Sequence, residues 1–230
     1  MSNSDSLTDR GRDHSRRYLV VELVAVFLAL PILLVFIRTT FRQWIIPTLL
    51  LVAAICVRTL WRDSSFDRRR LWSWRQPGCH LRRSLGLFVP GALVLSLLVA
   101  TLEPDRLLQL PRNRPVLWVV VLILYPALSV YPQELIFRTF FFHRYRQLFV
   151  RPRSMIAASA VAFGLAHLFF ANWLAPLLGT LGGLLFATTY RRSDSTLQAF
   201  LEHSLWGDFV FTVGLGWYFY GGSIVLMAGS

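Results

Sequence analysis

The sequence contains no lysine, few acidic residues and only two cysteines. Its 24 basic residues are all arginine, against 12 acidic residues, which gives a formal net charge of +12. Such an arginine bias is typical of a GC-rich bacterial genome. Cys56 lies in an apolar run and Cys79 in a basic loop, so they give neither a disulfide framework nor a metal-ligand spacing. Residues 1–17 are polar and no small-residue cleavage site follows the first apolar run, so we expect no removable signal peptide.

Apolar residues make up most of what is present. The 230 residues are 55% hydrophobic with a mean hydropathy of +0.51, which is too apolar for a soluble domain. Several uncharged runs approach the ~20 residues that a helix needs to cross a bilayer. The sequence therefore predicts an all-α, polytopic membrane protein.

The apolar runs predict about seven transmembrane helices in one bundle. We expect them at 18–37, 43–57, 84–102 and 115–142, then two within 154–190, and the last at 196–213. The chain then divides into four parts: a polar N-terminal segment (1–17), three helices with a basic loop at 58–83 (18–114), a core of four helices (115–213) and an aromatic tail (214–230). We also expect a kink at Pro132 and a chain reversal at 172–176.

The arginines predict the orientation of the bundle. With seven spans and a cytoplasmic N-terminus, 19 arginines fall in cytoplasmic loops and 5 in outer loops, as the positive-inside rule requires. Loop 58–83 mixes eight arginines with Trp61, Trp72 and Trp74, a mixture that suits the surface of an anionic membrane. Membrane lipid is thus an expected partner, and nucleic acid is not.

A carboxylate and a guanidinium lie four residues apart within one apolar helix. Glu134 and Arg138 share a face at this spacing, and ionisable residues inside a membrane usually mark a functional site. His167 and His203 lie on two further helices. Counting back to the nearest cytoplasmic arginine at ~1.5 Å per residue puts Glu134 at roughly 15 Å depth, His203 at roughly 16 Å and His167 at roughly 21 Å.

Three ionisable groups at a common depth predict a hydrated cavity open to the cytoplasm. There a carboxylate can deprotonate water, one imidazole can orient it, and a second can stabilise an oxyanion. Arg138 would hold Glu134 ionised. Each group also has a structural interpretation, since a single histidine can simply join two helices and Glu134–Arg138 can be an ion pair. The common depth favours a water-activating hydrolase.

The motifs Glu134-x-x-x-Arg138, Phe163-x-x-x-His167 and His203 resemble those of the CAAX-protease and bacteriocin-processing (CPBP, or ABI) family. Its members are intramembrane glutamic endopeptidases with the motifs EExxxR, FxxxH and HxxxN/D on successive helices. The resemblance covers about residues 115–213. It implies that His167 positions the water, that His203 contributes to the oxyanion hole and that Arg138 orients the carboxylate.

Two positions depart from the family pattern. Gln133 stands where the family has its first glutamate, and a neutral amide cannot act as a base. Either Glu134 takes that role or the chain is non-catalytic. Gly207 stands at the Asn/Asp position, and Asp208, one residue later, would point about 100° away on a regular helix. Glu202 is adjacent to His203 and does not share its face.

The leading interpretation is an intramembrane endopeptidase without cofactor or metal, which cleaves a peptide or membrane-anchored protein from the cytoplasmic side of a bacterial inner membrane. A zinc-dependent version ranks low because no HExxH-like pair sits on one helix. One alternative is a non-catalytic relative that binds a peptide or partner, indicated by Gln133 and Gly207. Another is a proton-coupled transporter, since buried Glu, Arg and His also build proton relays.

Overall fold

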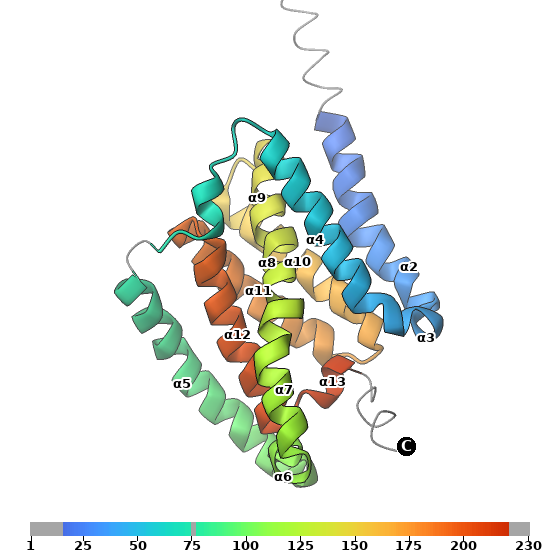
Figure 1. Ribbon diagram of the computed structural model, residues 1–230, viewed down its shortest axis with the longest axis vertical. Helices are drawn as coiled ribbons and strands as arrows, with labels where there is room; N and C mark the ends of the chain where they lie inside the picture. Colours follow the sequence, from blue (N-terminus) through green and yellow to red (C-terminus); the bar gives the residue numbers. More distant parts are fainter. Residues whose placement is uncertain (1–15, 75–76, 221–230) are drawn as a thin grey trace, which may run out of the picture.

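The structure is a computed structural model that describes residues 16–74 and 77–220, and every regular element in these residues is helical. The α-helices are α2 (Leu30–Phe36), α3 (Arg38–Phe41), α4 (Ile45–Arg62), α5 (Pro77–Leu102), α6 (Gln109–Asn113), α7 (Pro115–Tyr125), α8 (Tyr131–Glu134), α9 (Phe141–Arg144), α10 (Pro152–Ala166), α11 (Leu174–Ser193), α12 (Thr196–Val213) and α13 (Trp217–Tyr220). Figure 1 shows the long helices as one bundle. The predicted segment 1–17 and the end of the predicted tail fall almost wholly outside the described residues.

Five helical stretches are long and apolar enough to cross a membrane: Arg16–Phe36, Arg38–Arg62, Arg82–Leu102, Pro115–Arg144 and Pro152–Phe170. Helices α11 and α12 have 20 and 18 residues, but their polar side chains keep both helices out of this group of five. The chain is therefore an all-helical, multi-pass membrane protein. The count of seven spans and the cytoplasmic N-terminus stay predictions.

One continuous helical rod, 115–144, positions the candidate site. It consists of α7, α8 and α9, joined by the π-helical segments Pro126–Val130 and Leu135–Phe140. Pro126 and Pro132 cannot donate a backbone hydrogen bond, which favours such local widening. The rod packs against α4, α10, α11 and α12, so its side chains meet those of four other helices (Figure 1).

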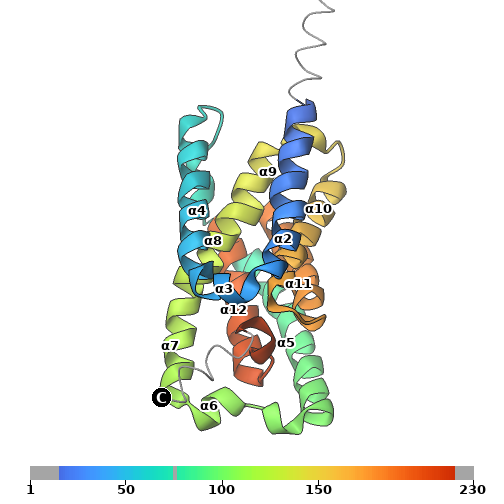
Figure 2. The same ribbon diagram turned by 90° about the vertical axis from the view of Figure 1, so that its right-hand side faces the viewer.

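Helices α2 and α5 lie at the edges of the bundle. Helix α2 packs against α10, and α5 packs against α12, as the two views together show (Figures 1 and 2). Both expose large apolar side chains such as Leu33 and Leu97, which are 61% and 66% exposed. These outward faces suit contact with lipid acyl chains.

Helices α10 and α11 pack closely through small residues. If Gly183 carried a Cβ, that atom would lie 2.9 Å from Ala160 Cα. A Cβ on Gly179 would lie 3.4 Å from Gly164 Cα. Gly179 and Gly183 lie four residues apart and face Gly164 and Ala160 of α10. Small residues at this spacing let membrane helices approach closely.

The chain reverses between α10 and α11 as predicted. A short 3₁₀ segment, His167–Phe170, ends α10, Ala171 adopts a left-handed conformation with φ 53°, and α11 begins at Leu174. The described part of the tail folds back onto this turn, where Asn172 Nδ2 donates to the Tyr218 carbonyl at 2.8 Å.

Candidate functional site

Glu134 is the centre of the candidate site. It ends α8 and is fully buried. His203 Nδ1 lies 2.9 Å from its Oε1, and Arg138 Nε lies 3.3 Å from its Oε2. An ionised carboxylate only accepts hydrogen bonds, so His203 Nδ1 carries the proton in this pair. The structure therefore brings together three of the predicted site residues from the rod and α12.

Arg138 is a fully buried cation with few partners. Its Nη1 lies 3.4 Å from Ser159 Oγ, and its guanidinium carbon lies 4.7 Å from the centroid of the Phe163 ring. Among the described residues, Nη2 has no hydrogen-bond partner. A buried guanidinium with an unused donor has room for one more acceptor, such as a water or a carbonyl oxygen.

His203 is fixed on both ring edges and on one face. Its ring stacks on Phe186 with a centroid distance of 4.3 Å and an angle of 16°. On the edge opposite Glu134, Nε2 lies 3.4 Å from the Tyr125 hydroxyl. In the neutral imidazole Nε2 is an acceptor, so Tyr125 is the donor in that contact. Three side chains from two other helices thus define one orientation of this imidazole.

His167 joins the same cluster through Phe163. Its Nδ1 lies 2.7 Å from the Phe163 carbonyl oxygen, which can only accept, so Nδ1 is protonated. In the neutral ring this leaves the lone pair on Nε2. The Phe163 ring makes edge contacts with both imidazoles, at centroid distances of 4.7 Å to His167 and 5.4 Å to His203. Phe163, the first residue of the second motif, lies between the two histidines.

Tyr125 is the site residue that the sequence analysis missed. A Cβ at position 207 would lie 2.6 Å from the Tyr125 hydroxyl oxygen and 2.5 Å from its Cε1. Gly207 therefore leaves the space in which the phenol of Tyr125 lies, one helical turn beyond His203. No motif marks Tyr125; the signal was Gly207 itself, since a missing side chain beside a buried imidazole allows another helix to supply the polar group.

Gln133 and Glu202, the polar neighbours of Glu134 and His203 in the sequence, make their hydrogen bonds outside this cluster. Gln133 Nε2 donates to Ser129 Oγ at 2.7 Å, one turn back on the same rod. Ser84 Oγ donates to Glu202 at 2.7 Å, so Glu202 faces α5 and not the site, as expected. Asp208 Oδ1 is buried without a hydrogen-bond partner among the described residues. His203 pairs with Glu134 and Tyr125, and Asp208 stays a predicted site-lining residue.

Neither of two cavities in the described part of the chain is lined by Glu134, His167 or His203. One lies at the arginine-rich end of the rod, and the other beside the α10–α11 turn. The hydrated hollow expected around the three groups stays a prediction. No three His, Cys, Asp or Glu side chains of residues 16–74 and 77–220 are grouped as metal ligands.

A match to a known protein family covers the segment that contains Glu134, His167 and His203. Residues 113–209 match the model of the family described as Rce1-like, the type II CAAX prenyl endopeptidases. No curated protein and no solved structure matches the chain. The matching segment contains Tyr125, Gln133, Glu134, Arg138, Phe163, His167, His203 and Asp208. As the motifs predicted, residues 113–209 are similar to the Rce1-like, CPBP family.

Proposed function

We propose that the protein is an intramembrane endopeptidase that hydrolyses a peptide bond of a membrane-associated substrate. One observation carries the proposal: within the segment that matches a protease family, one buried carboxylate is shared by Arg138 and His203, 3.3 Å and 2.9 Å from its two oxygens. A buried, hydrogen-bonded carboxylate–imidazole pair is a common way to hold a histidine ready for proton transfer.

His167 is the group that we propose to take the proton from water. Its Nδ1–H donates to the Phe163 carbonyl, which leaves the Nε2 lone pair as the base. Glu134, by contrast, is fully buried and each of its oxygens already faces a cation or an N–H group. In this scheme Glu134 serves the reaction through His203 instead of contacting water directly, which changes the role that the sequence alone favours.

We assign stabilisation of the oxyanion to Arg138 and Tyr125, which contact Glu134 and His203. When the hydroxide attacks the substrate carbonyl, negative charge develops on its oxygen and must meet preorganised donors. The unused Nη2 of Arg138 is such a donor in a buried position, and the Tyr125 hydroxyl becomes a second one when its proton turns from His203 Nε2 to the oxyanion. The His167 imidazolium would then pass the proton that it took from water to the leaving amine, while Glu134 holds His203, and through it Tyr125, in place.

The arginine distribution supports an active site that opens to the cytoplasm of a bacterial inner membrane. The substrate class is a peptide or membrane-anchored protein whose scissile bond lies within the cytoplasmic half of the bilayer.

The test is a cleavage assay with the purified full-length protein in detergent and membrane-anchored peptides. We expect His167→Ala to lower the cleavage rate by ~10²-fold or more, as loss of a proton-transferring group does. We expect His203→Ala to lower it by ~10²-fold or more as well, because Glu134 and Tyr125 then lose the imidazole that joins them. Gln133→Ala is the matched control. It removes one hydrogen bond to Ser129 and no contact of the cluster, so activity should stay within ~3-fold of wild type.

A second candidate is a non-catalytic relative that binds a peptide or partner protein. Gln133 favours it, since the amide at the family's base position is engaged by Ser129 and cannot accept a proton. The discriminating result is partner binding that survives His167→Ala and His203→Ala, with no cleavage by the wild type. Cleavage that is lost in both variants would support the peptidase.

A further inference from the structure

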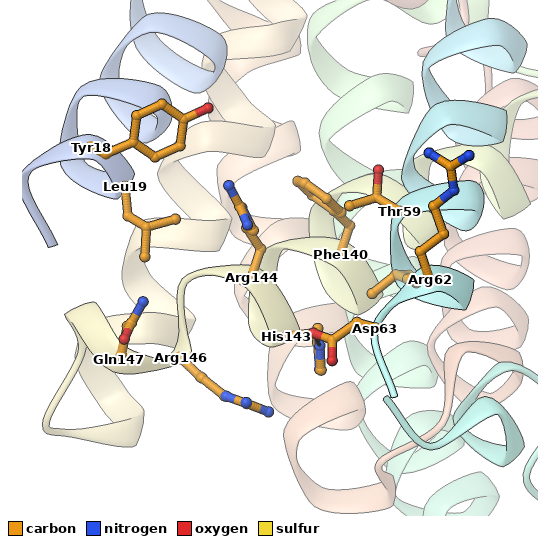
Figure 3. Close-up of a pocket in the computed structure, with 11 residues that line it drawn as sticks. Tyr18, Leu19, Thr59, Arg62, Asp63, Phe140, His143, Arg144, Arg146 and Gln147 are labelled. Carbon is orange, nitrogen blue, oxygen red and sulfur yellow. Dashed lines mark hydrogen bonds and ion pairs between the residues drawn. The ribbon is translucent and has the colours of Figure 1, made fainter. Parts of the chain in front are cut away.

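The cavity at the end of the central rod is lined by cationic side chains from three elements. Its volume is about 520 Å³, and its lining includes Arg62, Arg144, Arg146, Asp63 and His143 (Figure 3). Such a volume is in the range of small-ligand sites, roughly 300–1,000 Å³. None of the residues proposed for catalysis lines it, so it is a separate feature of the molecule.

The acidic groups near the cavity neutralise only some of these charges. Arg144 is held by Glu22 through two hydrogen bonds of 3.0 and 2.7 Å. Asp63 accepts a hydrogen bond of 2.7 Å from His143 Nε2. The hydrogen bonds from His143 and then from Ser65 hold the pKa of Asp63 well below its usual range, so this carboxylate stays charged and engaged.

Two guanidiniums remain without an acidic partner among the described residues, Arg62 and Arg146. Arg62 ends α4 and is exposed, and Arg146 is exposed and donates only a 3.3 Å hydrogen bond to Ser65 Oγ. In Figure 3 Arg144 projects between Tyr18 and Phe140, and Arg146 extends toward His143 and Asp63. Guanidinium groups stay charged at any physiological pH and bind phosphate oxygens in a forked geometry.

The remaining lining indicates where an anion would come from. Leu19, Leu60 and Phe140 give the cavity an apolar side, and all three belong to membrane-crossing helices. The stretches Arg38–Arg62 and Pro115–Arg144 both end at this cavity, the level of a membrane surface. A ligand with a negative headgroup and an apolar body would contact both the arginine side and the apolar side of this cavity. A free inorganic anion would contact the arginine side alone.

We propose that this cavity binds the phosphate headgroup of an anionic phospholipid. The lipid would come from the leaflet next to the arginine-rich loops, and Arg62 and Arg146 would be the cations that bind its phosphate. The lipid would hold the end of the rod, α4 and the N-terminal helix together at the membrane surface. The inference does not depend on peptidase activity.

The experiment counts lipids bound to the full-length protein by native mass spectrometry. Phosphatidylglycerol, phosphatidylcholine and inorganic phosphate are titrated separately, and phosphate is also added as a competitor. The test variant is Arg62→Gln/Arg146→Gln. The matched control is Arg191→Gln/Arg192→Gln, which removes two exposed arginines at the end of α11. Arg62→Lys/Arg146→Lys keeps the charge, and size-exclusion chromatography checks that each variant is folded.

We expect wild type and the control to bind phosphatidylglycerol with similar affinity, and the test variant to bind it ~10-fold or more weakly, since each arginine near a lipid surface contributes ~1 kcal/mol. The Lys variant should retain most of the affinity. Equal binding by the test variant, equal loss in the control, or equal affinity for phosphatidylcholine overturns the proposal. Displacement of the lipid by millimolar phosphate would mean a site for free phosphate and would overturn the lipid assignment.

Discussion

At the scale of single residues, the site depends on how one buried carboxylate is shared. Glu134 and Arg138 are both completely buried, and removing either partner would leave a charge without compensation inside the bundle. His203 lies on the other oxygen of Glu134 and against Tyr125. These contacts therefore both stabilise the fold and orient the His203 imidazole. An informative substitution changes one of these two effects and leaves the other intact.

A reciprocal substitution at positions 125 and 207 tests whether Tyr125 occupies the place of the missing side chain. Gly207→Asn alone puts a Cβ 2.5 Å from Tyr125 Cε1, so we expect a loss of stability of ~1–3 kcal/mol from overpacking. Combined with Tyr125→Ala, the asparagine has space, and stability and cleavage should partly recover. Thermal unfolding in detergent and the cleavage rate measure both effects.

Tyr125→Phe is the control for the hydroxyl alone. It keeps the ring that fills the space beside Gly207 and removes one hydrogen bond, so cleavage should fall by ~2- to 10-fold with little change in stability. If the double variant is less stable than both single variants, the two side chains do not share one space and the assignment of Tyr125 is wrong.

Part of this residue-scale picture could be predicted from the sequence. The four-residue spacing of Glu134 and Arg138 predicted their contact, and common depth predicted that His203 would reach the same level. Tyr125 and the turn of Gln133 toward Ser129 could not be predicted, because both depend on the rotation of α7 and α8 between two π-helical segments, which periodicity does not encode.

At the scale of helices, small residues bring α10 and α11 together and set the position of His167. A Cβ at position 183 would lie 2.9 Å from Ala160 Cα, and one at position 179 would lie 3.0 Å from His167 Nδ1. The spacing of the glycines is visible in the sequence. Which alanine face opposes them is not, since that depends on the helix rotation fixed by α2 and the rod.

Gly183→Ala tests this close approach. The added methyl has no space against the backbone of Ala160, so we expect a loss of ~1–3 kcal/mol. Gly86→Ala in α5 is the matched control, because a Cβ there meets nothing within 4 Å, and its higher helix propensity should leave stability unchanged or slightly raised. Unfolding of both variants in the same detergent is the measurement, and equal stabilities would contradict the packing described.

We expect the stability of the link between α4 and α9 to depend on pH, because Asp63 at the end of α4 accepts a hydrogen bond from His143 of α9. Hydrogen bonds from His143 and Ser65 lower the pKa of Asp63, so its stabilising contribution is full above the unfolded value of ~3.9 and is lost as pH falls below it. Wild type should therefore be more stable than Asp63→Asn at pH 6, and the difference should shrink toward pH 3. Unfolding midpoints across this range measure it.

Asp105→Asn, a change at another exposed aspartate, is the control and should show no such pH-dependent difference. A constant gap between wild type and Asp63→Asn down to pH 3 would mean that the carboxylate does not stabilise the junction through its charge.

At the scale of the whole molecule, the membrane class and the helical fold could be predicted from hydrophobic run length alone. Five stretches meet the length and hydropathy of a span, and the family match covers the C-terminal core. Helix α12 has the predicted boundaries, and α11 ends three residues beyond the predicted 190, although the polar residues of both helices lower their hydropathy. Those polar residues include His203, so one residue of the site lies on a helix that does not reach the hydropathy of the five spans.

The activity of Glu134→Gln against a membrane-anchored peptide is the most direct test of the central claim, which is that cleavage requires the Glu134 carboxylate that holds His203. The amide is nearly isosteric and keeps a hydrogen bond toward His203, and size-exclusion chromatography verifies the fold. We predict that the variant is less stable than wild type, because Arg138 loses its counter-ion, and that the folded fraction cleaves ~10²–10⁴-fold more slowly, as loss of the carboxylate in a carboxylate–histidine pair does. A folded Glu134→Gln variant that cleaves at the wild-type rate would contradict the account.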